Sequence, residues 1–196
     1  MTVKRLLCIT LVAVTAVLVA APVTAFALVK PLRVVVPTLV PGVICIKDTL
    51  CTDDAAKFDA ARALYHDGYA KARDAVGPFR DAPRVVFCST PACAHAFGLG
   101  AQAAQTVGDF GVIVAPRGWK SFYLAHELIH YRQAEVLGNL AVATRPKWLI
   151  EGMAYSLSGD PRHPLTEPFE QWRTQFEAWH ASIGTRDMWA AARAIR

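Results

Sequence analysis

The first hydrophobic block of the chain runs from Leu6 to Val29 without a charged residue, directly after Lys4 and Arg5. A basic start followed by an apolar run is typical of an export signal. The run exceeds the roughly 20 residues that span a bilayer as a helix, so it also fits an uncleaved anchor. The small residues of Ala25–Ala27 instead offer a cleavage site for a signal peptidase. Both interpretations place the rest of the chain outside the cytoplasm.

Beyond residue 30, apolar positions alternate between strand-like runs and helical spacing. β-branched runs predict extended structure or a linker over Val34–Ile46, and strands over Arg84–Cys88 and Phe110–Ala115. A helix is predicted from Asp53 or Asp54 to about Val76, and a short helix or turn over Pro91–Phe97. Three further helices are predicted over Ser121–Leu137, about Pro146–Leu157, and Glu167–His180.

This order of elements predicts an α+β fold in which a short mixed sheet packs on helices. The chain has 196 residues, enough for one domain with a substantial core and too few for two comfortable ones. We therefore expect residues 1–29 to be a signal peptide or an N-terminal membrane anchor through residues 6–29. Residues 30–196 are expected to form a single domain, periplasmic or extracellular.

The charge balance argues against one class of partner. The chain has 21 Lys and Arg residues against 16 Asp and Glu residues, and two of the basic ones lie in the N-terminal segment. The remaining excess is small and spread out, and no basic block alternates with aromatic residues. We therefore expect no nucleic acid partner.

Four cysteines lie in the exported part, namely Cys45, Cys51, Cys88 and Cys93. An even number in an exported domain favours disulfides, and four cysteines allow three connectivities. The short loops favour the pairs Cys45–Cys51 and Cys88–Cys93. A structural zinc site is the competing interpretation, although neither spacing is the tight C-x2-C type.

The residues from His126 to His130 form the sequence H-E-x-x-H inside a predicted helix. Residues four apart lie on one face of a helix, so the two imidazoles can bind one Zn²⁺ at about 2.0–2.1 Å. Glu127 lies about 100° round the helix from His126 and need not be a ligand. It can act as the general base for a water on the metal.

Glu151 lies on the next predicted helix and is the candidate third ligand. A hydrolytic zinc site needs three protein ligands and an open position. The neighbours Trp148, Leu149, Ile150 and Met153 are apolar, and a carboxylate among them needs a partner. A short connection between the two helices would return Glu151 to the histidines, and Gly152 permits a close backbone approach.

These motifs together resemble the gluzincin metallopeptidases. The H-E-x-x-H sequence is followed, after about twenty residues, by Trp148–Ala154 (W-L-I-E-G-M-A), which is similar to the aminopeptidase branch. The resemblance covers about Phe122–Leu157, and the chain length is closer to the small single-domain members. It implies a zincin-like domain, with zinc on His126, His130 and Glu151.

The resemblance also implies that Glu127 is the base and proton shuttle. It implies an edge strand that precedes the H-E-x-x-H helix in the chain. This strand hydrogen-bonds an extended peptide substrate, and Phe110–Ala115 lies where it is expected. Thermolysin-like members carry an acidic residue four positions after the glutamate ligand, where this chain has Tyr155. The upstream G-x-M-E-N type of exopeptidase signature is missing, so aminopeptidase specificity is not supported.

Hydrolysis also requires a donor for the developing oxyanion. The candidates are Tyr155, Arg162, His163 and His180. Tyr155 lies one helical turn beyond Glu151, and His163 lies in a loop just downstream. We take these two, with Glu127, as the candidate catalytic residues.

The sequence therefore favours a zinc-dependent metallopeptidase that acts on a peptide or protein substrate. Two alternatives stay open: a catalytically weak zinc-binding scaffold protein, and a zinc amidase that acts on cell-wall material. The same water attack serves peptide and cell-wall amides, so the motif does not separate them. Nothing in the sequence indicates the oligomeric state.

Overall fold

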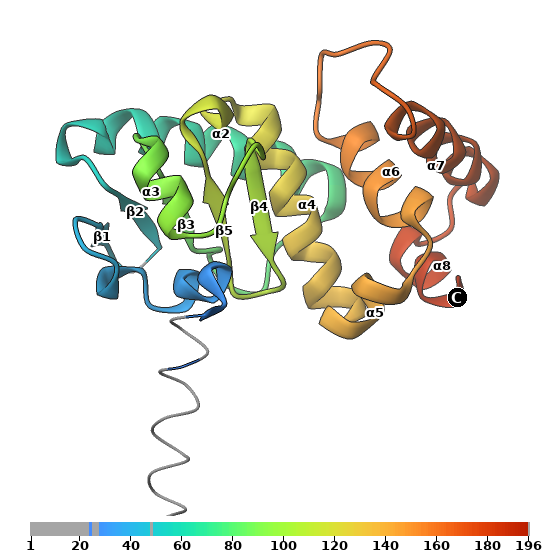
Figure 1. Cartoon of the computed structure of the whole chain (residues 1–196). Helices are drawn as coiled ribbons and strands as arrows, with labels where there is room; N and C mark the ends of the chain where they lie inside the picture. The colour runs from blue at the N-terminus through green and yellow to red at the C-terminus, as the bar shows by residue number, and fades with distance from the viewer. Residues whose placement is uncertain (1–23, 25–27, 48, 196) are drawn as a thin grey trace, which may run out of the picture.

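The computed structural model describes residues 24, 28–47 and 49–195 (Figure 1). The predicted signal peptide or anchor, residues 1–29, therefore lies almost wholly outside the described residues. Among the residues that are described, no helix is both long and apolar enough to cross a membrane.

Five strands form one mixed sheet in the order β1-β2-β3-β5-β4. They are β1 (Ile44–Ile46), β2 (Leu50–Thr52), β3 (Val85–Phe87), β4 (Ala104–Val107) and β5 (Gly111–Val114). The three inner strands β2, β3 and β5 run parallel, and the two outer strands pair antiparallel to their neighbours. The predicted short mixed sheet is confirmed.

The edge strand next to the helix that carries His126 and His130 is β4, so the prediction that Phe110–Ala115 forms this edge was wrong. β5 occupies that stretch and pairs with β3 on one side and β4 on the other. Every residue of β5 is buried, whereas every residue of β4 is partly exposed. A fully apolar strand is covered on both faces and belongs inside a sheet, which is the physical reason for the difference.

The helices are α2 (Phe58–Val76), α3 (Pro91–Ala96), α4 (Ser121–Leu137), α5 (Asn139–Thr144), α6 (Lys147–Leu157), α7 (Phe169–Ile183) and α8 (Met188–Ala194). The predicted helices are present within a few residues of their expected ends, and α5 and α8 are additional. Single-turn 3-10 segments, η3 (Ala55–Lys57) and η4 (Pro116–Gly118), precede α2 and α4. Together with the sheet, these helices confirm a mixed α+β fold.

The sheet separates two apolar clusters. Val85, Phe87, Val112 and Val114 face a large cluster that includes residues of α2, α4 and α6. The alternate residues of the same strands face a smaller cluster with α3 and the N-terminal turns. Figure 1 shows α6, α7 and α8 on the side of α4 away from the sheet. α4 is therefore the element that joins the sheet to the C-terminal helices.

The extended structure or linker predicted for Val34–Ile46 was largely wrong. Two 3-10 turns, η1 (Lys30–Val35) and η2 (Pro37–Leu39), precede the short strand β1. A proline in the first turn of each fixes the backbone angle φ near the helical value. Val34 is completely buried in the smaller cluster, so this segment is part of the domain.

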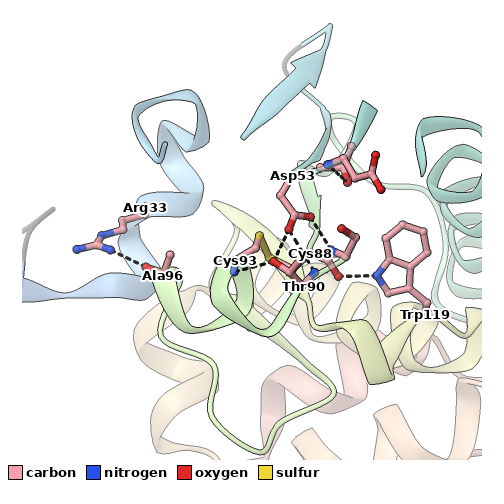
Figure 2. Close-up of a disulfide and its surroundings, with 10 residues drawn as sticks. Arg33, Asp53, Cys88, Thr90, Cys93, Ala96 and Trp119 are labelled. Atoms are coloured by element: carbon pink, nitrogen blue, oxygen red, sulfur yellow. Dashed lines mark hydrogen bonds between the residues drawn. A yellow bond between two sulfur atoms is a disulfide. The ribbon is translucent and has the colours of Figure 1, made fainter. Parts of the chain in front are cut away.

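Both predicted disulfides are present. Cys45 and Cys51 lie directly opposite each other on β1 and β2. Cys88 and Cys93 join the end of β3 to α3 (Figure 2). The four cysteines are therefore not a zinc site, and the two disulfides fit an oxidising, exported compartment.

Candidate metal centre

His126 and His130 project from one face of α4. The opposite face of this helix packs into the large cluster through Leu124, Leu128 and Ile129. This packing turns both imidazoles towards α6, where their Nε2 atoms lie 3.1 Å apart. The helical spacing of the H-E-x-x-H sequence thus gives the predicted pair of adjacent nitrogens.

Glu151 joins them from α6, as predicted. Its Oε2 atom lies 3.4 Å from Nε2 of His130 and 3.8 Å from Nε2 of His126. α5 connects the two helices, and α6 returns alongside α4 (Figure 1). On the far side of α6, a Cβ atom at Gly152 would lie only 2.2 Å from the carbonyl oxygen of Trp172. Glycine therefore permits the close contact with α7 that sets the position of Glu151.

The three donors can hold one metal ion. Zinc binds imidazole nitrogen and carboxylate oxygen at about 2.0–2.2 Å, which places the donors of a tetrahedral site roughly 3.3–3.5 Å apart. The observed separations between the donor atoms scatter around this value. Two histidines and a carboxylate leave a fourth position open, as in hydrolytic zinc sites.

The electrostatics of the metal-free site depend on a buried ion pair. Burial favours the neutral form of Glu151, but the hydrogen bond and charge of His130 outweigh it and lower the pKa of Glu151 to about 2. Burial also disfavours the His130 imidazolium, but Glu151 outweighs it and raises the pKa of His130 to about 9. Burial and the charge of His130 lower the pKa of His126 to about 3. One proton is therefore held between His130 and Glu151 at neutral pH.

Gln133 fixes the orientation of His130. Its amide nitrogen donates to the carbonyl oxygen of Ile150 at 2.9 Å, so its oxygen Oε1 faces Nδ1 of His130 at 2.8 Å. An amide oxygen only accepts, so Nδ1 carries the hydrogen and Nε2 is directed to the metal position. Gln133 is completely buried. Sequence reasoning missed this residue, although a polar side chain three positions after His130 on the same helical face was the available signal.

Glu127 lies beside the metal position and is held by the edge strand. The hydroxyl of Thr106 on β4 lies 2.7 Å from Oε2 of Glu127 and 2.7 Å from its carbonyl oxygen. Burial raises the pKa of the Glu127 carboxyl above its ordinary value. A carboxylate with a raised pKa is better matched to a proton-transfer role near neutral pH. The sequence analysis did not predict a strand at Ala104–Val107, so it did not identify Thr106 as a site residue.

Tyr155 follows Glu151 by one turn of α6 and lies against the metal site. Its ring centroid lies 4.4 Å from that of His126 and 5.2 Å from that of Phe169. Burial raises the pKa of Tyr155 to about 12. The phenol therefore stays protonated at neutral pH and can donate a hydrogen bond.

Position 155 carries no carboxylate, but the loop after α6 brings the carboxylate of Asp160 near His126. Asp160 is buried and accepts hydrogen bonds from the Arg162 guanidinium, with Nε 2.9 Å from Oδ1. Its charge favours the protonated form of His126, and the charge of the paired Arg162 opposes this effect. Asp160 thus adds a negative charge near His126, and sequence reasoning did not predict this residue as part of the site.

Two of the other predicted donors, His163 and His180, lie elsewhere, whereas Arg162 lines the smaller hollow beside the metal site. His163 is exposed, and its Nδ1 atom accepts from Arg173 of α7 at 2.7 Å. Arg173 in turn pairs with Glu170. The His180 ring stacks on Phe176, also within α7. The structure therefore brings Tyr155 to the metal site and places His163 and His180 with α7.

Two hollows meet at the metal site. The larger, about 580 Å³, lies between β4, α5 and α6, and the smaller, about 320 Å³, lies towards η4 and the loop after α6. Both are lined by His126, Glu127 and Tyr155, together with Ala104 of β4 and the nearby Gln102. The metal position is thus reached from an open cleft that follows the edge strand.

Comparison with known proteins gives this chain no family. No family model matches it, and neither a curated protein nor a solved structure matches it significantly. The resemblance to the gluzincins therefore depends on the motif residues, and the geometry of the described residues places three of them around one metal position.

Proposed function

We propose that this protein is an exported, zinc-dependent metallopeptidase with a zincin-like domain of the gluzincin type. The observation that carries the proposal is the convergence of His126, His130 and Glu151 on one position, with the Glu127 carboxylate beside it in an open cleft. The two disulfides support export.

In this proposal, His126, His130 and Glu151 hold the zinc ion. When bound, zinc supplies Lewis acid chemistry that polarises the attacking water and the substrate carbonyl. Glu127 removes a proton from that water as its oxygen forms a bond to the carbonyl carbon. Glu127 then gives the proton to the leaving nitrogen as the C–N bond breaks. Thr106 holds the carboxylate in position for both transfers.

The edge strand β4 provides a place for the substrate. Among the described residues, β4 pairs only with β5, so its other edge is open to hydrogen bonding. An extended peptide can add to such an edge as a further strand. Because Thr106 of β4 touches Glu127, a peptide in this position runs past the general base.

Tyr155 is the proposed donor for the oxyanion. It lines both hollows next to His126, and it stays protonated at neutral pH. Its hydroxyl donates a hydrogen bond to the oxygen that becomes negative when the water attacks. We expect Tyr155→Phe to lower kcat more than KM, because this bond strengthens in the transition state.

The proposal is tested on the full-length chain, purified after export under oxidising conditions. Wild type and Glu127→Gln are compared for zinc content and for cleavage of a mixed peptide library. We expect both to contain zinc, with cleavage by Glu127→Gln lower by roughly 10²–10⁴-fold. Glu177→Gln, on the exposed surface of α7, is the matched control and should cleave normally.

The alternatives predict different results. Zinc in the wild type without any cleavage would favour a scaffold protein. Cleavage of peptidoglycan but not of peptides would favour a cell-wall amidase. Equal peptide cleavage by wild type and Glu127→Gln would show that Glu127 is not the base.

A further inference from the structure

The two hollows beside the metal site differ in charge. Apart from the residues that both share, the smaller hollow is lined by two arginines, Arg117 and Arg162. Among its lining residues, the only carboxylate is Glu127. The larger hollow has Lys147 at its edge but also contains Glu151. Beyond the Glu127 carboxylate that both hollows share, the smaller hollow therefore adds only positive side chains, whereas the larger adds one of each sign.

The backbone on either side of Arg117 is held against the start of β4. Arg117 lies in the turn η4, where the amide of Ala115 donates to the carbonyl of Ala103 at 2.9 Å. A Cβ atom at Gly118 would lie only 2.0 Å from that same carbonyl oxygen, so glycine is required there. These contacts hold Arg117 at the beginning of β4, next to Ala104. A peptide that follows the edge strand to this end passes beside Arg117.

Arg162 reaches the same hollow from the loop after α6. Its guanidinium lies over the rings of Tyr123 and Phe122, at 5.1 Å and 5.6 Å from their centroids. Its charge is matched by Asp160, whose side chain is only 2% exposed. The Asp160 carboxylate is thus already paired with Arg162. No carboxylate of the described residues forms an ion pair with the exposed Arg117.

We propose that this smaller hollow is a subsite for a carboxylate of the substrate, with Arg117 as the residue that determines the specificity. The inference rests on the proposed peptidase function. Asp160 neutralises Arg162, and Glu127 is held by Thr106 on β4, so Arg117 keeps a positive charge that a substrate carboxylate can pair with. Arginine presents several N–H donors in a planar fork that fits a carboxylate. The carboxylate is an acidic side chain or a free C-terminus, since both present the same group.

Binding is measured separately from cleavage, on the full-length Glu127→Gln chain loaded with zinc. The probes are fluorescein-labelled oligoalanine peptides that carry one Glu or one Gln at each position in turn. A second pair ends in a free carboxylate or in an amide. Fluorescence anisotropy gives the dissociation constant of each probe. We expect about tenfold tighter binding of one charged probe than of its neutral partner, equivalent to about 1.4 kcal/mol.

Substitutions at Arg117 test the assignment. Arg117→Gln should abolish most of the preference for the charged probe, and Arg117→Glu should favour a Lys-containing peptide instead. Arg62→Gln, which removes an exposed arginine from α2, is the control and should keep the preference. Circular dichroism of each variant checks that it is folded. The preference should also decrease with added salt, because Arg117 is exposed.

The outcomes separate this inference from the proposed function. A preference for the Glu side chain supports one source of the carboxylate, and a preference for the free terminus supports the other. Equal binding of charged and neutral probes, or a preference that survives Arg117→Gln, would overturn the subsite. If the wild type cleaves no peptide but the Arg117-dependent preference is present, the peptidase proposal fails and the subsite stands.

Discussion

Gln133 accepts a hydrogen bond from Nδ1 of His130 at 2.8 Å, and its amide group also donates to the carbonyl of Ile150. One buried side chain therefore orients a metal ligand on α4 and ties it to α6 next to Glu151. Replacing a partner of this kind typically lowers metal affinity or activity by about 10–100-fold.

Replacing Gln133 should weaken metal binding. Gln133→Leu removes the acceptor for His130, and we expect zinc affinity to fall by roughly 10–100-fold. Gln133→Glu keeps an acceptor for His130 but loses the donor to Ile150, so its affinity should fall less than that of Gln133→Leu. Competition with a fluorescent zinc chelator measures both variants. Equal affinities for wild type and Gln133→Leu would show that the hydrogen bond does not orient the ligand.

Zinc binding should release one proton at neutral pH. His130 has a pKa of about 9 without metal, so it is protonated at pH 7, whereas Glu151 and His126 are not. A metal ion must displace this proton, so affinity should rise about tenfold per pH unit from pH 6 to 8. Titration calorimetry in buffers of different ionisation enthalpy counts the protons.

Glu151→Gln, measured without metal because it lacks a proposed zinc ligand, is the control for the protonation of His130. It removes the carboxylate that raises the pKa of His130, while burial continues to lower that pKa. NMR of the metal-free variant should therefore show His130 deprotonated at pH 7. Release by the wild type that is independent of pH between 6 and 8 would contradict this account of the ion pair.

The Thr106 hydroxyl should set the pH range of activity. Its hydrogen bond lowers the pKa of Glu127, in opposition to the larger effect of burial. Thr106→Val removes this bond, so the pKa of Glu127 should rise further. Since the base must be deprotonated to act, the acid limb of kcat/KM should move to higher pH. Thr106→Ser keeps the hydroxyl and should leave the limb unchanged, and an unchanged limb in Thr106→Val would refute this role.

Gly152→Ala should disturb the metal site without touching a ligand. The new methyl group would lie 2.2 Å from the carbonyl oxygen of Trp172, so α6 and α7 must move apart. We expect a loss of about 1–3 kcal/mol in the free energy of unfolding, and weaker zinc binding through displacement of Glu151. Gly100→Ala, where a Cβ atom has only an ordinary contact, is the matched control. Denaturant unfolding and zinc titration check both effects.

The sequence predicted those parts of the site that lie on long regular helices. His126 and His130 are adjacent because residues four apart share a helical face, whatever surrounds them. Glu151 was predicted because an unpaired carboxylate among apolar residues is costly. Both disulfides followed from short loops between cysteines. These inferences need only local geometry and simple energetics.

The parts that were missed depend on tertiary context. β4 has only Thr106 and Val107 as β-branched residues, and its mixed composition resembles a loop. Phe110–Ala115 is more strand-like, but it is drawn to the centre of the sheet by its apolar character. Asp160 and Arg162 act on the site from an irregular loop, whose path no periodicity predicts. Gln133 was marked in the sequence only by its place on the helical face of His130, and its partner on α6 depends on tertiary packing.

The most direct test of the metal centre is zinc-edge X-ray absorption on the full-length protein purified with its native metal. The account predicts one zinc per chain, bound by two imidazole nitrogens and by carboxylate oxygen at about 2.0–2.2 Å. Both His130→Ala and Glu151→Ala should remove this signal. A protein without zinc, or a zinc ion with sulfur ligands at about 2.3 Å, would contradict the account.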